Sequence, residues 1–183
     1  MDRIAGGIID AYRTRGPARA AFGTCEVWGL TRNRSHDPHT HNRTVTDKRQ
    51  DPQRKWVTVN PELHLLRVDR VVGESTEPLA AAVVFSIHGT GISMKAKEYN
   101  ADLWAYLTDE LGHRIVRSHG GSLGQRPVVG AIEGTHADVA PALHPGTAGH
   151  LEAQRVGRGI GAEAAALYER LEKELTDRVD LAC

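Results

Sequence analysis

Apolar residues recur every three or four positions in three segments of the chain, which predicts helices over residues 2–15, 98–116 and 150–179. The first of these segments ends at Gly16-Pro17, a pair that stops a helix. The last carries three glycines at alternate positions within residues 157–161. Each glycine weakens the helix, and small residues of this kind let a neighbouring element pack closely.

Two segments have patterns of apolar residues that are typical of β-strands. Aromatic and β-branched residues predict a strand over residues 21–30. Residues 63–72 predict a second strand, with Leu63, Leu65 and Arg67 on one face because side chains two positions apart share a face.

Two more strands are almost continuously apolar. Residues 73–78 form a hairpin-like turn, and the apolar run over 79–87 that follows is typical of a central strand covered on both faces. Residues 126–132 predict a second buried strand. Because the helix over 98–116 lies between the two, the order strand, helix, strand predicts a βαβ unit with a parallel strand pair.

The pattern as a whole predicts an α/β fold, with a buried mixed or parallel sheet and flanking helices. The 183 residues suit one domain. Residues 31–55 are almost entirely polar and predict a long loop, and loops of this length are usually functional or mobile.

Composition narrows the classes of partner. The 23 basic and 23 acidic residues balance, which argues against attraction to nucleic acid or to an anionic membrane. The longest apolar stretch is too short to cross a bilayer, so we expect no transmembrane segment, and the N-terminus does not resemble a secretory signal. Cys25 and Cys183 support neither a metal knuckle nor a disulfide framework.

Candidate chemistry follows the two apolar strands. His88 comes directly after the strand over 79–87, and His136 and Asp138 come after the strand over 126–132. Because parallel strands end at the same edge of a sheet, these side chains are expected to face one crevice. Two plainer interpretations remain open: His88 binds only its own loop, and Asp138 caps a turn before Pro141.

A second histidine group lies in the polar segment. His36, His39 and His41 fall within six residues, a pattern found in zinc sites and equally in solvated loops. The run Gly-Arg-Gly-Ile-Gly-Ala at 157–162 lies within a helical pattern with no strand before it, which argues against a dinucleotide-binding loop.

Several short segments, in order along the chain, resemble the neutral ceramidases, the neutral/alkaline non-lysosomal family. They are Asn33-Arg34-Ser35, Val-Asn-Pro-Glu-Leu-His-Leu-Leu-Arg at 59–67, Phe-Ser-Ile-His-Gly-Thr at 85–90, Tyr-Asn-Ala-Asp at 99–102, and Gly-Ala-Ile-Glu-Gly-Thr-His-Ala-Asp-Val-Ala-Pro at 130–141.

The resemblance implies a zinc-dependent hydrolase that cleaves the N-acyl bond of ceramide to sphingosine and a fatty acid. It implies that His88 is a zinc ligand, and that Asn33, Arg34 and Asp138 contact the N-acyl lipid. A secreted or extracellular location is implied by the resemblance alone.

The chain departs from the family pattern in two ways. The family's other zinc ligands fall outside the aligned segments, and the pair His39 and His41 follows Asn33-Arg34-Ser35, whereas the family's His-Thr-His precedes it. Ala140 occupies the position of the family's Ser, and Ala137 that of a Gly. We therefore expect a partial catalytic domain, either a fragment or a diverged form. The alternatives are a non-catalytic lipid-binding module and an unrelated hydrolase that uses His136 and Asp138.

Overall fold

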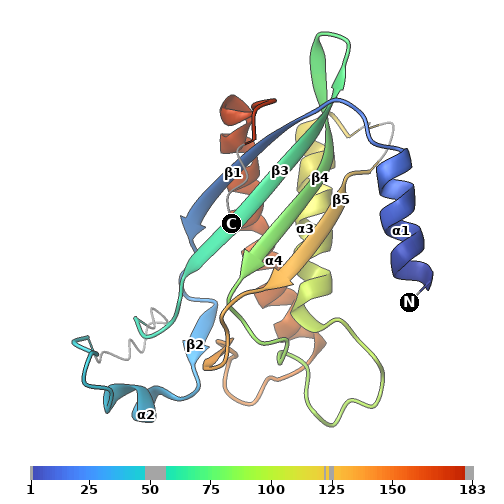
Figure 1. Cartoon of the computed structure of the whole chain (residues 1–183). Helices are drawn as coiled ribbons and strands as arrows, with labels where there is room; N and C mark the ends of the chain where they lie inside the picture. Colours follow the sequence, from blue (N-terminus) through green and yellow to red (C-terminus); the bar gives the residue numbers. More distant parts are fainter. Residues whose placement is uncertain (1, 48–56, 122, 124–125, 180–183) are drawn as a thin grey trace.

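A four-stranded sheet with two helices on one face forms the centre of the molecule (Figure 1). The computed structural model describes residues 2–47, 57–121, 123 and 126–179. The strands are β1 (Ala18–Glu26), β3 (Glu62–Val72), β4 (Ser75–Phe85) and β5 (Val128–Glu133), in the spatial order β1-β3-β4-β5. The helices on this face are α3 (Asp102–Ser118) and α4 (His150–Arg170), and a short 3-10 helix, Leu171–Glu174, follows α4.

The connections within the sheet agree with the sequence pattern. Strands β3 and β4 form an antiparallel hairpin whose turn contains Gly73 at φ +60°, a conformation that glycine adopts without steric cost. Strand β5 runs parallel to β4, with α3 between them in the chain, so the predicted βαβ unit is confirmed.

The core lies between the sheet and the two helices. Leu63, Leu65 and Arg67 all face it, as the alternation predicted, and each is at most 2% exposed. The buried Arg67 is held by a buried partner, since its Nε and Nη2 donate to Asp69 at 3.0 and 2.6 Å. Tyr168 Oη also donates to Asp69, at 3.0 Å, so the buried carboxylate accepts three hydrogen bonds.

The sequence pattern misjudged two strands. The segment 79–87 is central but not covered on both faces: Ala81, Val83 and Phe85 are buried, whereas the side chains between them stay partly exposed. The segment 126–132 is not a second buried strand. It forms β5 at the edge of the sheet, where Val128 is 67% exposed and Ile132 is 54% exposed. Both differences have one cause, because the helices cover a single face.

Helices α3 and α4 approach closely through the glycines of α4. An added Cβ at Gly161 would lie 2.8 Å from the Leu107 carbonyl oxygen, and one at Gly157 would meet the Leu103 carbonyl oxygen. The predicted close packing at 157–161 is therefore confirmed. The same run lies inside a helix, which agrees with the argument against a dinucleotide-binding loop.

The polar segment predicted as a loop contains two short elements. Strand β2 (Thr31–Asn33) pairs antiparallel with β6 (Val139–Pro141), and α2 (His36–Thr40) follows β2. The prediction of a structureless loop over 31–55 is wrong at its start, because β2 gains its partner from a segment more than one hundred residues away. Residues 48–56 of that prediction lie outside the described residues.

Helix α1 (Asp2–Arg13) has no buried residue and lies beyond β5 (Figure 1). None of the helices in the described part of the chain is long and apolar enough to span a bilayer. Cys25 is a free thiol, and burial raises its pKa.

Candidate metal centre

His88 lies where β4 leaves the sheet, beside the turn that connects β5 to β6. Its backbone N–H donates to the Val139 carbonyl at 3.0 Å, and its Nε2 lies 3.3 Å from the Ala137 carbonyl oxygen. The side chain is 21% exposed. The imidazole is thus fixed at the edge of the sheet and accessible there, as the sequence predicted.

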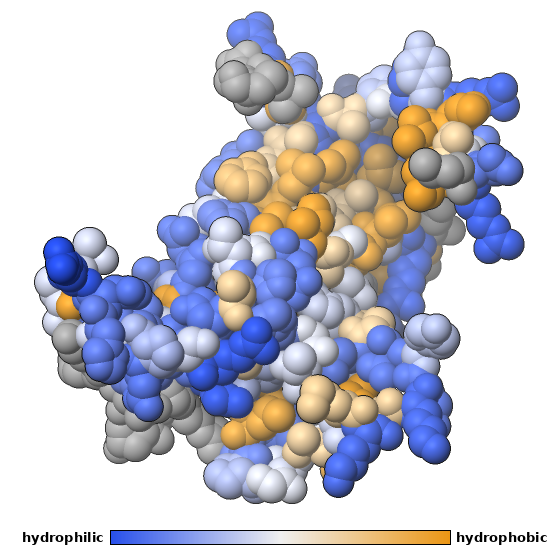
Figure 2. Space-filling model, turned by 60° about the horizontal axis from the view of Figure 1, so that its bottom comes forward, coloured by the Kyte–Doolittle hydropathy of each residue, from blue (hydrophilic) through white to orange (hydrophobic). Residues whose placement is uncertain are grey.

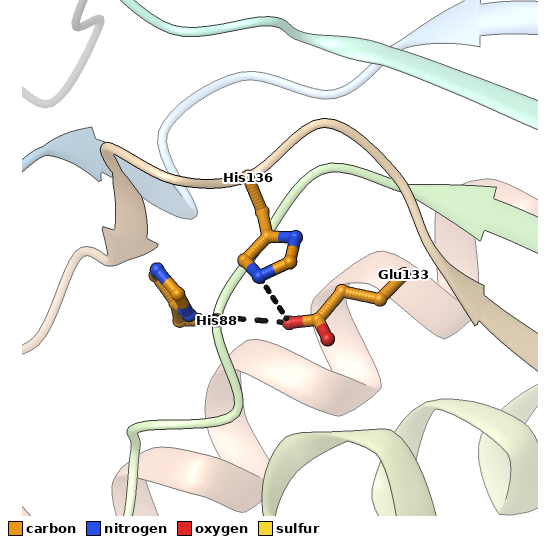
Figure 3. A group of neighbouring side chains, drawn as sticks. All are labelled: His88, Glu133 and His136. Carbon is orange, nitrogen blue, oxygen red and sulfur yellow. Dashed lines mark ion pairs between the residues drawn. The ribbon is translucent and has the colours of Figure 1, made fainter.

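Glu133 and His136 meet His88 at this edge (Figure 3). Glu133 is the last residue of β5 and is paired in register with Phe85, three residues before His88. Its Oε1 lies 4.0 Å from Nδ1 of His88 and 3.4 Å from Nε2 of His136. The two imidazole rings stand edge to face with centroids 4.3 Å apart, which confirms that His88 and His136 share one crevice.

Backbone carbonyls set the tautomers of both rings. Nδ1 of His136 lies 2.8 Å from the Gly134 carbonyl oxygen, and Nε2 of His88 faces the Ala137 carbonyl oxygen. A carbonyl oxygen only accepts, so each of these nitrogens carries the hydrogen. In the neutral imidazoles, the lone pairs are then on the other nitrogens, which are the two that face Glu133.

Three lone-pair atoms therefore converge at one point. The two nitrogens and the carboxylate oxygen lie within 4.8 Å of one another. Without a cation between them these atoms repel, and either a proton or a metal ion relieves the repulsion. Hydrogen bonds from the outer ring nitrogens to backbone carbonyls are the usual arrangement around a metal-binding histidine.

The spacing fits zinc after a small adjustment. Ligand atoms at about 2.0–2.1 Å from a tetrahedral zinc lie about 3.4 Å from one another. Glu133 and His136 already have this separation, at 3.4 Å, and His88 must approach Glu133 from 4.0 Å. The three ligand atoms all lie within 4.8 Å of one another, so small side-chain movements separate this arrangement from zinc spacing. Two histidines and one carboxylate leave a fourth position open, as in catalytic rather than structural zinc sites.

Asp102 fixes the loop that follows His88. Its carboxylate accepts the backbone N–H groups of Gly91, Ile92 and Leu103 at 2.9, 2.8 and 2.7 Å. The residue is buried and has φ +50°, a conformation that costs a non-glycine residue about 1–3 kcal/mol. These hydrogen bonds offset that cost and join the loop after His88 to the start of α3.

Comparison with known proteins identifies a known fold. No family model matches the chain, and no curated protein sequence matches it. Solved structures do match, among them neutral ceramidase from Pseudomonas aeruginosa, with a TM-score of 0.66 and 21% identity, and a ceramidase complexed with C2, with a TM-score of 0.63 and 19% identity. Each match covers 92% of this chain and 25% of the other.

The chain has the fold of part of a neutral ceramidase. The match confirms the structural side of the resemblance seen in the short motifs. It also shows that the chain spans about a quarter of the length of these structures.

The residues expected to contact substrate surround the same turn of this neutral ceramidase fold. Asn33 is buried and donates from Nδ2 to Asp138 Oδ2 at 2.8 Å and to the Thr58 carbonyl at 2.7 Å. Arg34 donates from Nη2 to the Ala137 carbonyl at 2.9 Å, the same oxygen that His88 faces. These contacts brace the turn beside the metal centre, and a role of Asn33, Arg34 and Asp138 in substrate binding stays a prediction.

Ala140 lies in β6 and is 4% exposed, paired with Arg32 across the small sheet. A methyl group at this position supplies neither a nucleophile nor a hydrogen bond. In the described residues His136 Nε2 lies 3.4 Å from Glu133, and Asp138 accepts a hydrogen bond from Asn33. An unrelated hydrolase that uses His136 and Asp138 stays a prediction.

The other histidine group forms no such centre. Within the described residues, three metal-ligand side chains converge only at His88, Glu133 and His136. His41 Nδ1 instead lies 2.7 Å from the Asp37 carbonyl oxygen, and His39 lines a pocket of about 700 Å³ together with residues 57–60 and 134–139.

Sequence reasoning did not single out Glu133 as a candidate ligand. It read the residue only as part of a motif, because the predicted strand ended at residue 132. Glu133 lies three residues before His136, and β5 ends beside β4. These two features indicate a shared metal site with His88 only once the pairing of Phe85 with Glu133 is known.

Proposed function

We propose that the chain binds zinc through His88, Glu133 and His136 and hydrolyses the N-acyl bond of a ceramide-like amide lipid. The observation that carries this proposal is the convergence of three lone-pair atoms, two of them on imidazoles whose other ring nitrogens face backbone carbonyls. The neutral ceramidase fold supports the choice of substrate class.

Zinc, when bound, polarises an acyl carbonyl and lowers the pKa of water towards neutrality. Hydrolysis adds the oxygen of one water to the acyl carbon, breaks the C–N bond and leaves a proton on the departing amine. With Ala140 in place of a serine, water rather than a side chain attacks the carbonyl.

The protein supplies orientation. Arg34 and Asn33 hold the turn that carries Ala137 and Asp138, so that the carbonyl of Ala137 keeps His88 in one tautomer. The pocket of about 700 Å³ includes His136 among its lining residues and is large enough for the amide and the adjoining part of a lipid.

One observation favours a second function, that of a non-catalytic lipid-binding module. The buried methyl group of Ala140 removes the polar group expected from the family pattern beside the reacting carbonyl. In that case the pocket binds the same amide lipid and no bond is cleaved.

The first test measures zinc itself. We expect the purified chain to bind one zinc ion, and His88→Ala, Glu133→Gln and His136→Ala each to weaken binding by roughly 100-fold or more, beyond the 10–100-fold typical of outer-shell groups. His113→Ala is the matched control, because His113 is an exposed histidine that lies near a carboxylate, that of Asp109, in a helix. Absence of zinc binding, or equal loss in the control, overturns the proposed centre.

The second test separates the two functions. Zinc-loaded protein is incubated with a short-chain ceramide, and the release of the fatty acid is measured against the His88→Ala variant. Release that depends on His88 supports hydrolysis. Lipid binding without release, in a protein that holds zinc, supports the binding module and overturns the hydrolase.

A further inference from the structure

The face of the sheet opposite α3 and α4 carries no charged residue in its central part. Side chains that pair across neighbouring strands share a face, so this surface is defined by three rows of four residues. We call it the open face; it consists of Ala20, Val68, Ala80, Val128, Phe22, Leu66, Ala82, Gly130, Thr24, His64, Val84 and Ile132.

The open face is large and accessible. Phe22 is 61% exposed, Val128 67% and Ile132 54%. Apolar surface gathers over the strands and on the neighbouring α1 (Figure 2). The largest contiguous apolar patch on a protein surface is often an interaction site.

Helix α1 also buries no residue against the described part of the chain. Ile4, Ile8 and Tyr12 are each at least 66% exposed and lie along one side of the helix. A helix of 12 residues is marginally stable in water without packing, and Gly6-Gly7 weakens this one further.

We propose that a second copy of the chain docks face to face on the open face. The central row is self-complementary: Phe22 and Leu66 form a ridge on β1 and β3, whereas Ala82 and Gly130 leave a hollow on β4 and β5. A two-fold axis parallel to the strands places Phe22 of each copy over Gly130 of the other. It likewise places each Leu66 over Ala82, so every ridge fills a hollow.

Charge agrees with self-association. The 23 basic and 23 acidic residues give no net repulsion between copies. The twelve residues of the open face include no Lys or Arg that would attract anionic lipid.

The area limits the strength of the association. Four strands about 4.8 Å apart and three rows about 6.7 Å apart cover roughly 400 Å² per copy. The total of roughly 800 Å² over both copies lies below the standard range of specific interfaces, so we infer a weak, reversible dimer.

Sedimentation equilibrium from about 1 to about 200 μM tests this inference, in the range where such an interface dissociates. We expect a monomer–dimer equilibrium that Phe22→Lys weakens roughly 10-fold or more. The control is Leu151→Lys, because Leu151 is 80% exposed and lies outside the open face. Circular dichroism confirms that each variant is folded.

A compensating pair tests the geometry. Gly130 has open space around it, so Gly130→Phe fits the monomer but fills the hollow that receives Phe22. We expect Gly130→Phe alone to weaken the dimer, and the addition of Phe22→Ala to restore it. A wild-type monomer at every concentration, or a Phe22→Lys variant that dimerises normally, overturns the inference. Wild-type monomer that floats with phosphatidylcholine vesicles assigns the face to lipid instead.

Discussion

At the scale of single residues, backbone carbonyls fix the tautomers of the two histidines at the candidate metal centre. The Gly134 and Ala137 carbonyls decide which nitrogen of His136 and of His88 is free to bind a cation. Their placement depends on the turn after β5. The sequence predicted that the two histidines would meet, but it held no information on which nitrogen each would present.

A second polar group, around Glu152, ties the loop before α4 to the helix. Its carboxylate accepts from Arg155 Nη2 at 2.9 Å and from the His144 backbone N–H at 3.0 Å, and it also pairs with the His144 ring. The hydrogen bond from Arg155, followed by that from His144, lowers the pKa of Glu152 from 4.5 to about 2. The folded state therefore favours the ionised carboxylate.

This shift predicts how stability depends on pH. A lowered folded-state pKa contributes stability above about pH 4.5 that is lost as the pH falls towards about 2. Glu152→Gln should be less stable than wild type at neutral pH, by about 2 kcal/mol for hydrogen bonds to a charged group. The difference should shrink through the acid range.

Urea unfolding at several pH values measures this difference. Glu169→Gln is the control, since Glu169 is exposed on the same helix. A constant difference between Glu152→Gln and wild type at all pH values contradicts the assignment.

At the scale of elements, the contact between α3 and α4 depends on residues that lack side chains. A Cβ at Gly157 would lie 2.8 Å from Tyr106 Cβ and still closer to the Leu103 carbonyl oxygen. The sequence showed that something would pack against these glycines. The identity of the partner helix became clear only from the fold.

Gly157→Ala should therefore destabilise the protein although alanine favours helices. Forcing the helices apart costs about 1–3 kcal/mol, more than the gain of up to about 1 kcal/mol in helix propensity. Thermal unfolding gives the comparison. Gly6→Ala in α1, where nothing lies within 4 Å of the added methyl group, should not lower stability. Equal effects of the two substitutions would argue against close packing as the cause.

At the scale of the whole molecule, the candidate metal ligands come from two distant segments. His88 follows β4, whereas Glu133 and His136 follow the crossover through α3. A bound ion thus joins the two ends of the βαβ unit, and it binds the folded state only, because the unfolded chain does not hold these groups together.

Zinc should therefore raise the melting temperature. At free zinc about 100 times above its dissociation constant, linkage gives about 2.7 kcal/mol, or roughly 5–10 °C for a chain of this size. Differential scanning calorimetry with and without a chelator measures the shift. The His88→Ala variant should show little of it, and an equal shift in that variant would indicate binding elsewhere.

The sequence by itself determined the main elements of the α/β fold. The 3.6-residue and two-residue periods of apolar positions are local properties, so the helices at α3 and α4, the β3–β4 hairpin and the parallel crossover could be predicted. The placement of His88 and His136 at one edge followed from that topology.

Tertiary structure alone decided which surfaces are covered and which groups meet. The run of apolar residues at 79–87 resembles a strand buried on both sides, yet burial depends on elements far away in the chain, and the helices cover one face. The pairing of β2 with β6 and the meeting of Glu133 with two histidines likewise depend on strand register. Register is a long-range property, because the partner of a strand cannot be identified from the residues of that strand alone.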